Sequence, residues 1–483
     1  MTAPNQVSPV PPADLPGTLG ELRTSGHHYR TVKQEIRDNL LARMRSGEER
    51  FPGIVGYEDT VLPEVERALL AGHDMVLLGE RGQGKTRLIR SLGALLDEWT
   101  PVIPGSVLNE HPMHPLTPAS RALVAEAGDE LPIGWLHRSM RYGEKLATPD
   151  TSVGDLIGDV DPIRIAQGRT LGDPETIHFG LVPRTNRGIF AVNELPDLAE
   201  RIQVALLNVL EERDIQVRGY QLRLPLDLLL VASANPEDYT NRGRIITPLK
   251  DRFGAEIRTH YPVDLELELA LIRQEADLVA DVPEHVLEVL ARFARAVRES
   301  PSVDPRSGVS ARFAIAAAET VAAAALRRAG LLAGSAPDGV RAEAAVARVG
   351  DAVSVTSTLR GKVEFESGEE GREIEVLAHL LRTATAETFR ARLAGLDLSG
   401  FTGLVAEGAV IETGELVSSA ELLRQVGTVP GLAKALDRLG LGDAPTPEEA
   451  AAGVEFVLEG LHLTRRLGKD VTESGRTVYG GRG

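Results

Sequence analysis

Hydrophobic positions follow two different patterns along the first half of the chain. Between Thr31 and Arg45 the apolar residues are three or four positions apart, which is the spacing of one face of an α-helix, and Ser46-Gly47 indicates its end. A second helix is predicted at residues 60–71. Short continuous apolar runs, typical of parallel strands that helices cover on both faces, occur at 75–78, 189–192 and 228–232. Because these runs alternate with helical segments, we predict an α/β core.

The second half of the chain has a helical pattern almost throughout. Residues 265–330 are rich in Ala and predict a small helical domain, and the remainder keeps a helical periodicity with a Gly- and Glu-rich break at 364–371. We therefore predict four parts. They are a disordered tail at 1–17, an α/β core at 18–262, a helical lid domain at 263–330, and a mostly helical C-terminal extension at 331–483 whose role the pattern does not reveal.

Composition narrows the classes of function. The chain has 483 residues and no Cys, so disulfides, thiolate metal sites and Cys nucleophiles are excluded. Its N-terminus lacks the features of a secretory signal, and no apolar stretch approaches the ~20 residues of a membrane span, so the cytoplasm is the simplest location. The net charge of −17 counts against nucleic-acid binding and favours soluble protein partners, although a local basic loop is compatible with it.

Residues 79–86 read Gly-Glu-Arg-Gly-Gln-Gly-Lys-Thr and fit the phosphate-loop pattern. The segment follows the predicted strand 75–78 and precedes a predicted helix at 87–96, a context that an accidental glycine-rich turn would not have. The glycines let backbone N–H groups turn towards phosphates, the Lys reaches the β- and γ-phosphates, and the Thr hydroxyl ligates Mg²⁺. The residues expected to bind the nucleotide here are Gly79, Glu80, Arg81, Gly82, Gln83, Gly84, Lys85, Thr86 and Arg87.

A second motif, at residues 188–194, is an apolar strand that ends in Asn193-Glu194. Most P-loop ATPases have Asp at the first of these two positions. The Asn193 amide still accepts a hydrogen bond from Mg²⁺-bound water but brings no charge. Glu194 keeps its carboxylate and is predicted to orient and deprotonate the attacking water. Two interpretations stay open: ATP turnover with weaker Mg²⁺ affinity, which we favour, or ATP binding with little turnover.

Together these motifs make the chain resemble the AAA+ ATPases of the magnesium-chelatase and MoxR branch over about residues 51–330. The fold that this implies is a P-loop core with a parallel sheet flanked by helices. The loop at 51–56 is similar to the family's adenine-contacting loop, through Ile54, Val55 and Gly56. Residues 150–187 resemble the family's insertion within the second core helix. Residues 215–224 alternate around a Gly turn, which independently predicts a β-hairpin at about 214–225.

The resemblance also implies roles for three further residues. Asn235, in Ala-Ser-Ala-Asn-Pro-Glu, resembles the sensor near the γ-phosphate, and Arg312 resembles a second sensor that faces the nucleotide. Arg252, in Leu-Lys-Asp-Arg-Phe-Gly, looks like the arginine finger that reaches the ATP of a neighbouring subunit, with Arg244 as the reserve choice. For any single Arg, a surface salt bridge is the alternative.

The implied function is a Mg²⁺- and ATP-dependent remodelling ATPase or chaperone in a hexameric ring, acting on a partner with a von Willebrand factor A domain. Its work would be metal insertion into a tetrapyrrole by another subunit, or maturation of a metalloprotein. Two alternatives stay open. One is a σ54-type transcriptional activator, whose Gly-Ala-Phe-Thr-Gly-Ala loop is missing, since the chain's Phe-Thr-Gly lies at 401–403. The other is an ATP-binding scaffold with little turnover.

Two other patterns carry no functional prediction. His111 and His114 form a superficially metal-like pair, which we interpret as part of a solvated Pro-rich loop. Residues 419–440 mimic a helix-turn-helix but have few basic residues, so we interpret them as ordinary packed helices.

Overall fold

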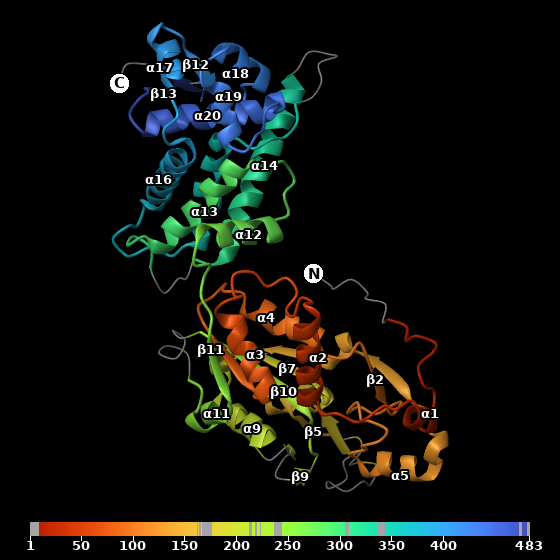
Figure 1. Cartoon of the computed structure of the whole chain (residues 1–483). Coiled ribbons are helices and arrows are strands. Elements are labelled where there is room, and N and C mark those ends of the chain that lie inside the picture. The colour runs from red at the N-terminus through yellow and green to blue at the C-terminus, as the bar shows by residue number, and fades with distance from the viewer. Residues whose placement is uncertain are drawn as a thin grey trace. The chain divides into compact units, whose positions relative to one another are not determined.

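The computed structural model divides into two compact units, Met1–His260 and Tyr261–Gly483 (Figure 1). The residues that it describes are 9–161, 163, 166, 176–211, 215–217, 220–222, 224–235, 244–304, 309–335, 343–472 and 476–480. The first unit is an α/β domain, and the second is predominantly helical.

A five-stranded parallel sheet forms the centre of the first unit, in the order β11-β1-β10-β7-β4. Its strands are Met75–Leu78 (β1), Tyr142–Leu146 (β4), Gly188–Asn193 (β7), Leu228–Ala234 (β10) and Ala255–Arg258 (β11). Every residue of β1, β7 and β10 is buried, as their continuous apolar sequences predict. The edge strands β4 and β11 are more exposed and were not predicted.

Helices cover both faces of this sheet (Figure 1). The helices Val32–Ser46 (α2), Val61–Ala71 (α3) and Lys85–Ser91 (α4) share a hydrophobic cluster with one set of alternating strand residues, and Glu200–Glu211 (α9) and Thr247–Arg252 (α11) share a second cluster with the other set. This arrangement follows from the two-residue period of a strand. The fold is therefore the P-loop α/β core that the sequence predicts, followed by a helical part.

Local sequence explains where α2 begins and ends. The Thr31 hydroxyl accepts a hydrogen bond from the Gln34 backbone N–H, and the Gln34 side chain accepts one from Thr31 N–H in return. Gly47, with φ of 75°, ends the helix in the left-handed conformation that favours Gly. The helix after the phosphate loop differs from the prediction of 87–96: α4 begins at Lys85 and becomes a 3₁₀-helix at Leu92–Leu95.

The remaining elements of the first unit are short. The predicted insertion at 150–187 lies partly outside the described residues, and its described part contains Val153–Leu156 (α6), Leu181–Arg184 (α8) and an antiparallel pair of Gly158–Val160 (β5) with Ile177–Phe179 (β6). Ile215–Val217 (β8) and Tyr220–Leu222 (β9) also pair antiparallel, on either side of the predicted Gly turn. The others are Leu19–Thr24 (α1), Trp99–Val102 (β2), Pro118–Ala127 (α5), Gly134–His137 (β3) and 3₁₀-turns at Gly128–Glu130, Arg138–Arg141 and Leu195–Asp197.

Of the predicted tail, residues 1–8 lie outside the described residues, and the Pro16 carbonyl accepts a hydrogen bond of 2.8 Å from Trp135 Nε1.

The second unit is built around one hydrophobic cluster, to which both the predicted lid (263–330) and the predicted extension (331–483) contribute. Its longer helices are Leu265–Glu275 (α12), Glu284–Glu299 (α13), Ala311–Ser335 (α14), Glu373–Leu393 (α16) and Pro447–Leu463 (α20). Shorter helices are Val349–Val353 (η7), Ser354–Thr358 (α15), Arg360–Lys362 (η8), Ser399–Ala406 (α17), Ser419–Val426 (α18) and Leu432–Arg438 (α19). A small antiparallel sheet of Ile411–Thr413 (β12), Thr477–Tyr479 (β14) and Lys469–Val471 (β13) was not predicted.

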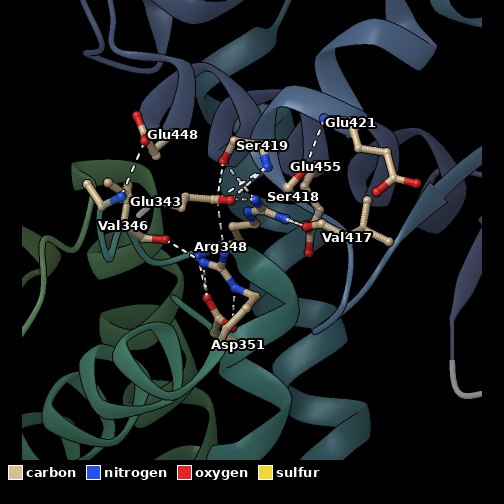
Figure 2. A network of polar contacts seen from close by, with 12 residues as sticks. Glu343, Val346, Arg348, Asp351, Val417, Ser418, Ser419, Glu421, Glu448 and Glu455 are labelled. Carbon is tan, nitrogen blue, oxygen red and sulfur yellow. Dashed lines mark hydrogen bonds and ion pairs between the residues drawn. The ribbon is translucent and has the colours of Figure 1, made fainter. Parts of the chain in front are cut away.

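A buried group of charged and polar side chains, which we term the polar network, lies inside the second unit (Figure 2). Its members are Arg328, Glu343, Arg348, Asp351, Ser419 and Glu455. Arg348 Nη2 donates to Glu343 Oε1 at 2.9 Å and to Ser419 Oγ at 2.8 Å, and Arg328 Nη2 pairs with Asp351 Oδ2 at 3.1 Å. Because these residues come from α14, η7, α18 and α20 and the segment before η7, the network joins distant parts of the unit.

His111 corrects one interpretation made from the sequence. It does not lie in a solvated loop, because only 2% of it is exposed. Its Nδ1 accepts a hydrogen bond from Met113 N–H at 3.0 Å, and its Nε2 is 3.0 Å from His27 Nε2. Burial, together with the nearby Arg187, lowers the pKa of His111 to about 2, so the ring is neutral. Among the described residues, no group of three or more His, Cys, Asp or Glu side chains is arranged to hold a metal ion.

Among the described helices, none has both the length and the apolar sequence that crossing a bilayer requires.

Candidate nucleotide-binding site

The predicted motifs of the first unit meet at one edge of the sheet. In the parallel register, Leu78 of β1 lies opposite Ala234 of β10, and Val192 of β7 lies opposite Ala232. Gly79 and Asn235, which follow β1 and β10, and Asn193, the last residue of β7, therefore lie at the same edge. Carboxyl ends of parallel strands are where ligands bind in open α/β sheets. The structure thus brings together three segments that are spread over more than 150 residues of the sequence.

The phosphate loop needs its glycines for two physical reasons. A Cβ atom at Gly79 would overlap Thr259 Oγ1 and Gln83 Oε1, so no larger residue fits there. Gly82 and Gly84 have φ angles of 75° and 76°, in the left-handed region that other residues rarely adopt. The loop backbone can therefore curve between β1 and α4 in the way that a bound phosphate requires.

Lys85 and Thr86 stand at the beginning of α4. Lys85 is only 6% exposed, and its ammonium group donates to the backbone carbonyls of Glu80, at 2.7 Å, and of Gly79. The ammonium is thus held against the loop backbone. The Thr86 hydroxyl lies 3.5 Å from Asn193 Oδ1, so the two oxygens predicted to face Mg²⁺ are neighbours. Hydroxyl, amide and carboxylate oxygens are the ligands that Mg²⁺ and its bound waters prefer, so these residues fit the ion.

Asn193 and Glu194 mark the end of β7. Asn193 Oδ1 accepts a hydrogen bond from Ser233 Oγ at 3.2 Å, and the backbone N–H of Glu194 donates to the same hydroxyl at 3.2 Å. Glu194 has a φ of 56°, a left-handed conformation that costs energy for a residue with a side chain. Such strain is found mainly at functional sites, where the surrounding structure supports it. The backbone turns away from β7 at Glu194, the residue whose carboxylate is predicted to act as the base.

Glu144, on β4, is a member of this site that the sequence analysis missed. Its Oε1 accepts a 2.7 Å hydrogen bond from Asn193 Nδ2, and its carboxylate also pairs with Arg90 of α4, at 2.8 and 2.9 Å, and with Tyr142 OH at 3.0 Å. Burial acts to raise the pKa of Glu144, but hydrogen bonds from Arg90 and Tyr142 outweigh it and lower that pKa, so the carboxylate is ionised. No local signal points to Glu144, because β4 is a short edge strand of mixed polarity.

The loop predicted to contact adenine is attached to the phosphate loop. Ile54 and Val55 are half-buried, and Gly56 is buried with φ of 85°. The next residue, Tyr57, donates its hydroxyl proton to the carbonyls of Gln83 and of His260, the second at 3.0 Å. Burial raises the pKa of Tyr57 to about 12, so the phenol stays protonated and remains a donor. This link was not visible in the sequence, because Tyr57 is 26 residues from Gln83.

The predicted arginines differ in their position. Arg252 is the last residue of α11 and Arg244 lies just before that helix, and both are exposed on the first unit. Arg312 belongs to the second unit, where it is exposed in the first turn of α14. Asn235, by contrast, is 3% exposed at the end of β10. Arg81 and Arg87 are exposed beside the phosphate loop, and Arg87 lies against Gly53.

A scan against protein-family models matches residues 170–252 to a family described as the Sigma-54 interaction domain. The matched segment contains Asn193, Glu194, Asn235 and Arg252, and it lies after the phosphate loop. No curated protein matches the chain.

Three solved structures illustrate the similarity to known proteins. NtrX from Brucella abortus is 16% identical, over 73% of this chain and 66% of that chain, with a TM-score of 0.39. The complex between subunits BchI and BchD of magnesium chelatase is 23% identical, over 68% and 98%, with a TM-score of 0.35. A RuvB mutant from Thermotoga maritima is 12% identical, over 88% and 93%, with a TM-score of 0.36. These TM-scores are all below 0.5, so the assignment rests on the motifs, the sheet and the family model. On those three grounds, this chain has a P-loop α/β core that resembles the core of AAA+ proteins.

Proposed function

We propose that this protein binds ATP with Mg²⁺ and hydrolyses it to remodel or activate a partner protein, as the magnesium-chelatase ATPase subunit and MoxR chaperones do. The observation that carries the proposal is the convergence of Lys85, Thr86, Asn193 and Glu194 at one sheet edge. A structural role alone would not require left-handed glycines, a buried lysine and a strained Glu194 at the same place.

In the proposed reaction each residue has a distinct task. The loop N–H groups and the Lys85 ammonium hold the β- and γ-phosphates, exchanging the carbonyl contacts of Lys85 for phosphate oxygens. Bound Mg²⁺ supplies positive charge that offsets the charge developing on the phosphate oxygens. Glu194 orients a water molecule and takes its proton, and the Asn235 amide contacts the γ-phosphate or that water. Arg252 acts on the nucleotide of a neighbouring copy, which fits its exposed position.

The proposed assembly is a homo-oligomeric ring, with six subunits by resemblance, in which Arg312 completes the site as a second sensor. The proposed partner is a soluble protein with a von Willebrand factor A domain in the cytoplasm. A metal-chelatase complex or a MoxR-type chaperone system is the setting that this resemblance suggests.

A second candidate is a σ54-type transcriptional activator, which the family match at residues 170–252 favours. The absence of a Gly-Ala-Phe-Thr-Gly-Ala sequence from the chain counts against it. Pulldown with σ54 RNA polymerase holoenzyme and with a von Willebrand factor A protein separates the two candidates.

The test is ATP turnover per subunit, measured with Mg²⁺ across a range of protein concentrations. We expect turnover to rise with concentration, because Arg252 acts between subunits, and to vanish in Glu194→Gln while ATP still binds. Arg252→Ala should lower turnover by roughly 10³-fold or more, the scale of an arginine finger, without weakening ATP binding to the same degree. A native protein that binds ATP but stays inactive at every concentration, with and without the partner, would leave the scaffold interpretation instead.

A further inference from the structure

We propose that Glu144 is a positioning residue for the Mg²⁺ site, and that it fixes the Asn193 amide so that its oxygen, and not its nitrogen, faces Thr86. The inference deepens the proposed function, because it rests on the binding of ATP with Mg²⁺. It assigns a role to the carboxylate of β4 that no motif predicts, and it gives a reason why an amide stands where most P-loop ATPases have Asp.

The two ends of the Asn193 amide have different partners. Its nitrogen donates to Glu144 Oε1 at 2.7 Å, and a carboxylate can only accept. Its oxygen accepts from Ser233 Oγ at 3.2 Å and lies 3.5 Å from Thr86 Oγ1. If the amide were reversed, its oxygen would face the carboxylate, and two acceptors would be in contact. Glu144 therefore permits one orientation, in which the acceptor end points to the metal side.

Glu144 is itself held in place by its neighbours. It lies opposite Ala191 in the pairing of β4 with β7, so its side chain is on the same sheet face as that of Asn193, two positions further along. Arg90 of α4 contacts both of its oxygens and Tyr142 OH contacts one. The carboxylate is thus oriented by a helix and a strand, so it holds Asn193 with little freedom.

The charge of Glu144 also changes the properties of the amide. A carboxylate that accepts from the N–H end of an amide polarises it, and this makes the oxygen at the other end a better acceptor. The pair Glu144–Asn193 thus places one negative charge behind a neutral ligand oxygen. An Asp at 193 would instead put two carboxylates within 3 Å of one another, and their repulsion would favour protonation of one of them. Asn193 and Glu144 are therefore matched to each other.

The experiment compares the native protein with Glu144→Gln, Asn193→Asp and the double variant. The readout is Mg²⁺ affinity in the presence of ATP, obtained from ATP binding with and without Mg²⁺ and from Mn²⁺ binding by electron paramagnetic resonance. In Glu144→Gln, Arg90 takes the new amide oxygen, so the new NH₂ group faces Asn193 and turns the Asn193 oxygen away from Thr86. We expect Mg²⁺ affinity to fall roughly 10-fold or more, the usual effect of losing such a supporting contact.

The decisive result is a reversal of sign between the two backgrounds. When position 193 is Asp, Glu144→Gln removes the like charge and should raise Mg²⁺ affinity. A purely structural role for Glu144 would weaken binding in both backgrounds. Tyr142→Phe is the matched control, because it removes one hydrogen bond to Glu144 and leaves the contact with Asn193, so Mg²⁺ affinity should stay near the native value.

The outcomes separate the two levels of the argument. Suppose that the native protein binds ATP, and that Glu144→Gln changes Mg²⁺ affinity in the same direction in both backgrounds or leaves it unchanged. The positioning role of Glu144 is then overturned, and the proposed function stays in place. Native protein that fails to bind ATP overturns both. ATP binding without Mg²⁺, which should be alike in all four proteins, and equal denaturation midpoints show that a change in Mg²⁺ affinity does not come from misfolding.

Discussion

Each unit of this protein contains a cluster of charged and polar side chains, and the two clusters differ in what surrounds them. In the second unit, Arg348 is 1% exposed and binds Glu343 and Ser419. In the first unit, the Lys85 ammonium donates to the carbonyl oxygens of Gly79 and Glu80, at the edge of the sheet where the Gly-rich loop follows β1. Similar residue types thus hold helices together in one unit and, in the function that we propose, bind a ligand in the other.

The difference teaches that burial and charge alone do not identify a functional site. Both clusters contain a buried basic group close to acidic groups that are at least partly buried, and both join segments far apart in sequence. What distinguishes the first is its place at the carboxyl ends of parallel strands, which is the edge at which ligands bind in open α/β sheets. The polar network lies between packed helices, where its charges meet mainly one another.

The largest effect is expected from Arg348→Met, which tests whether the polar network is structural. The change removes the guanidinium that donates to Glu343 Oε1 at 2.9 Å and lies 3.8 Å from the carboxylate of the buried Glu455. Breaking one side of a buried ion pair costs about 3–5 kcal/mol, and urea unfolding followed by circular dichroism measures it. ATP binding should be unchanged. The control is Arg327→Met, whose pair with Glu415 is more than 60% exposed on both sides and should cost under about 1 kcal/mol. Equal losses in the two variants would contradict a special role for the network.

Lys85→Ala tests the opposite case, a buried charge kept for binding. It removes charge-assisted contacts to phosphate, each worth about 1.5–3 kcal/mol, so ATP affinity should fall roughly 100-fold. Stability should change little, because the contacts of the ammonium with the carbonyls of Gly79 and Glu80 lie within a single loop. Fluorescence titration with a labelled ATP analogue measures affinity, and urea unfolding measures stability. A large loss of stability with normal ATP affinity would reverse the comparison between the clusters.

Acid should weaken both units by smaller and similar amounts. Burial lowers the pKa of His111 to about 2 and that of His285, which packs against Phe456, to about 3. Both folded values lie below the unfolded value of about 6.5, so the unfolded chain binds more protons and stability falls as pH drops below 6.5. Each His should cost about 1 kcal/mol between pH 6.5 and 5.5, measured by urea unfolding at both values.

His285→Leu and His111→Phe, tested separately, assign this pH dependence to a unit. Each should flatten the dependence of its own unit's transition and leave the other's intact. A pH dependence that persists in both variants would mean that other groups carry it.

Much of the fold was predictable because its signals are local. The three central strands are continuous apolar runs, and Thr31 and Gly47 mark the ends of α2 through contacts within a few residues. The phosphate loop is also local, since its glycines set the backbone of a single turn. The edge strands β4 and β11 were missed, because they are only partly buried and their sequences contain Glu, Lys and Arg in place of a continuous apolar run.

The sequence by itself determined the strands of the sheet core, the caps of α2 and the phosphate-loop motif, since each depends on residues that are near neighbours in the chain. The tertiary structure decided which side chains complete the sites. Glu144 meets Asn193 across 49 residues, and Arg348 meets Ser419 across 71. Such pairs have no periodicity or motif, because they form only when burial of the whole hydrophobic core brings particular strand and helix faces together.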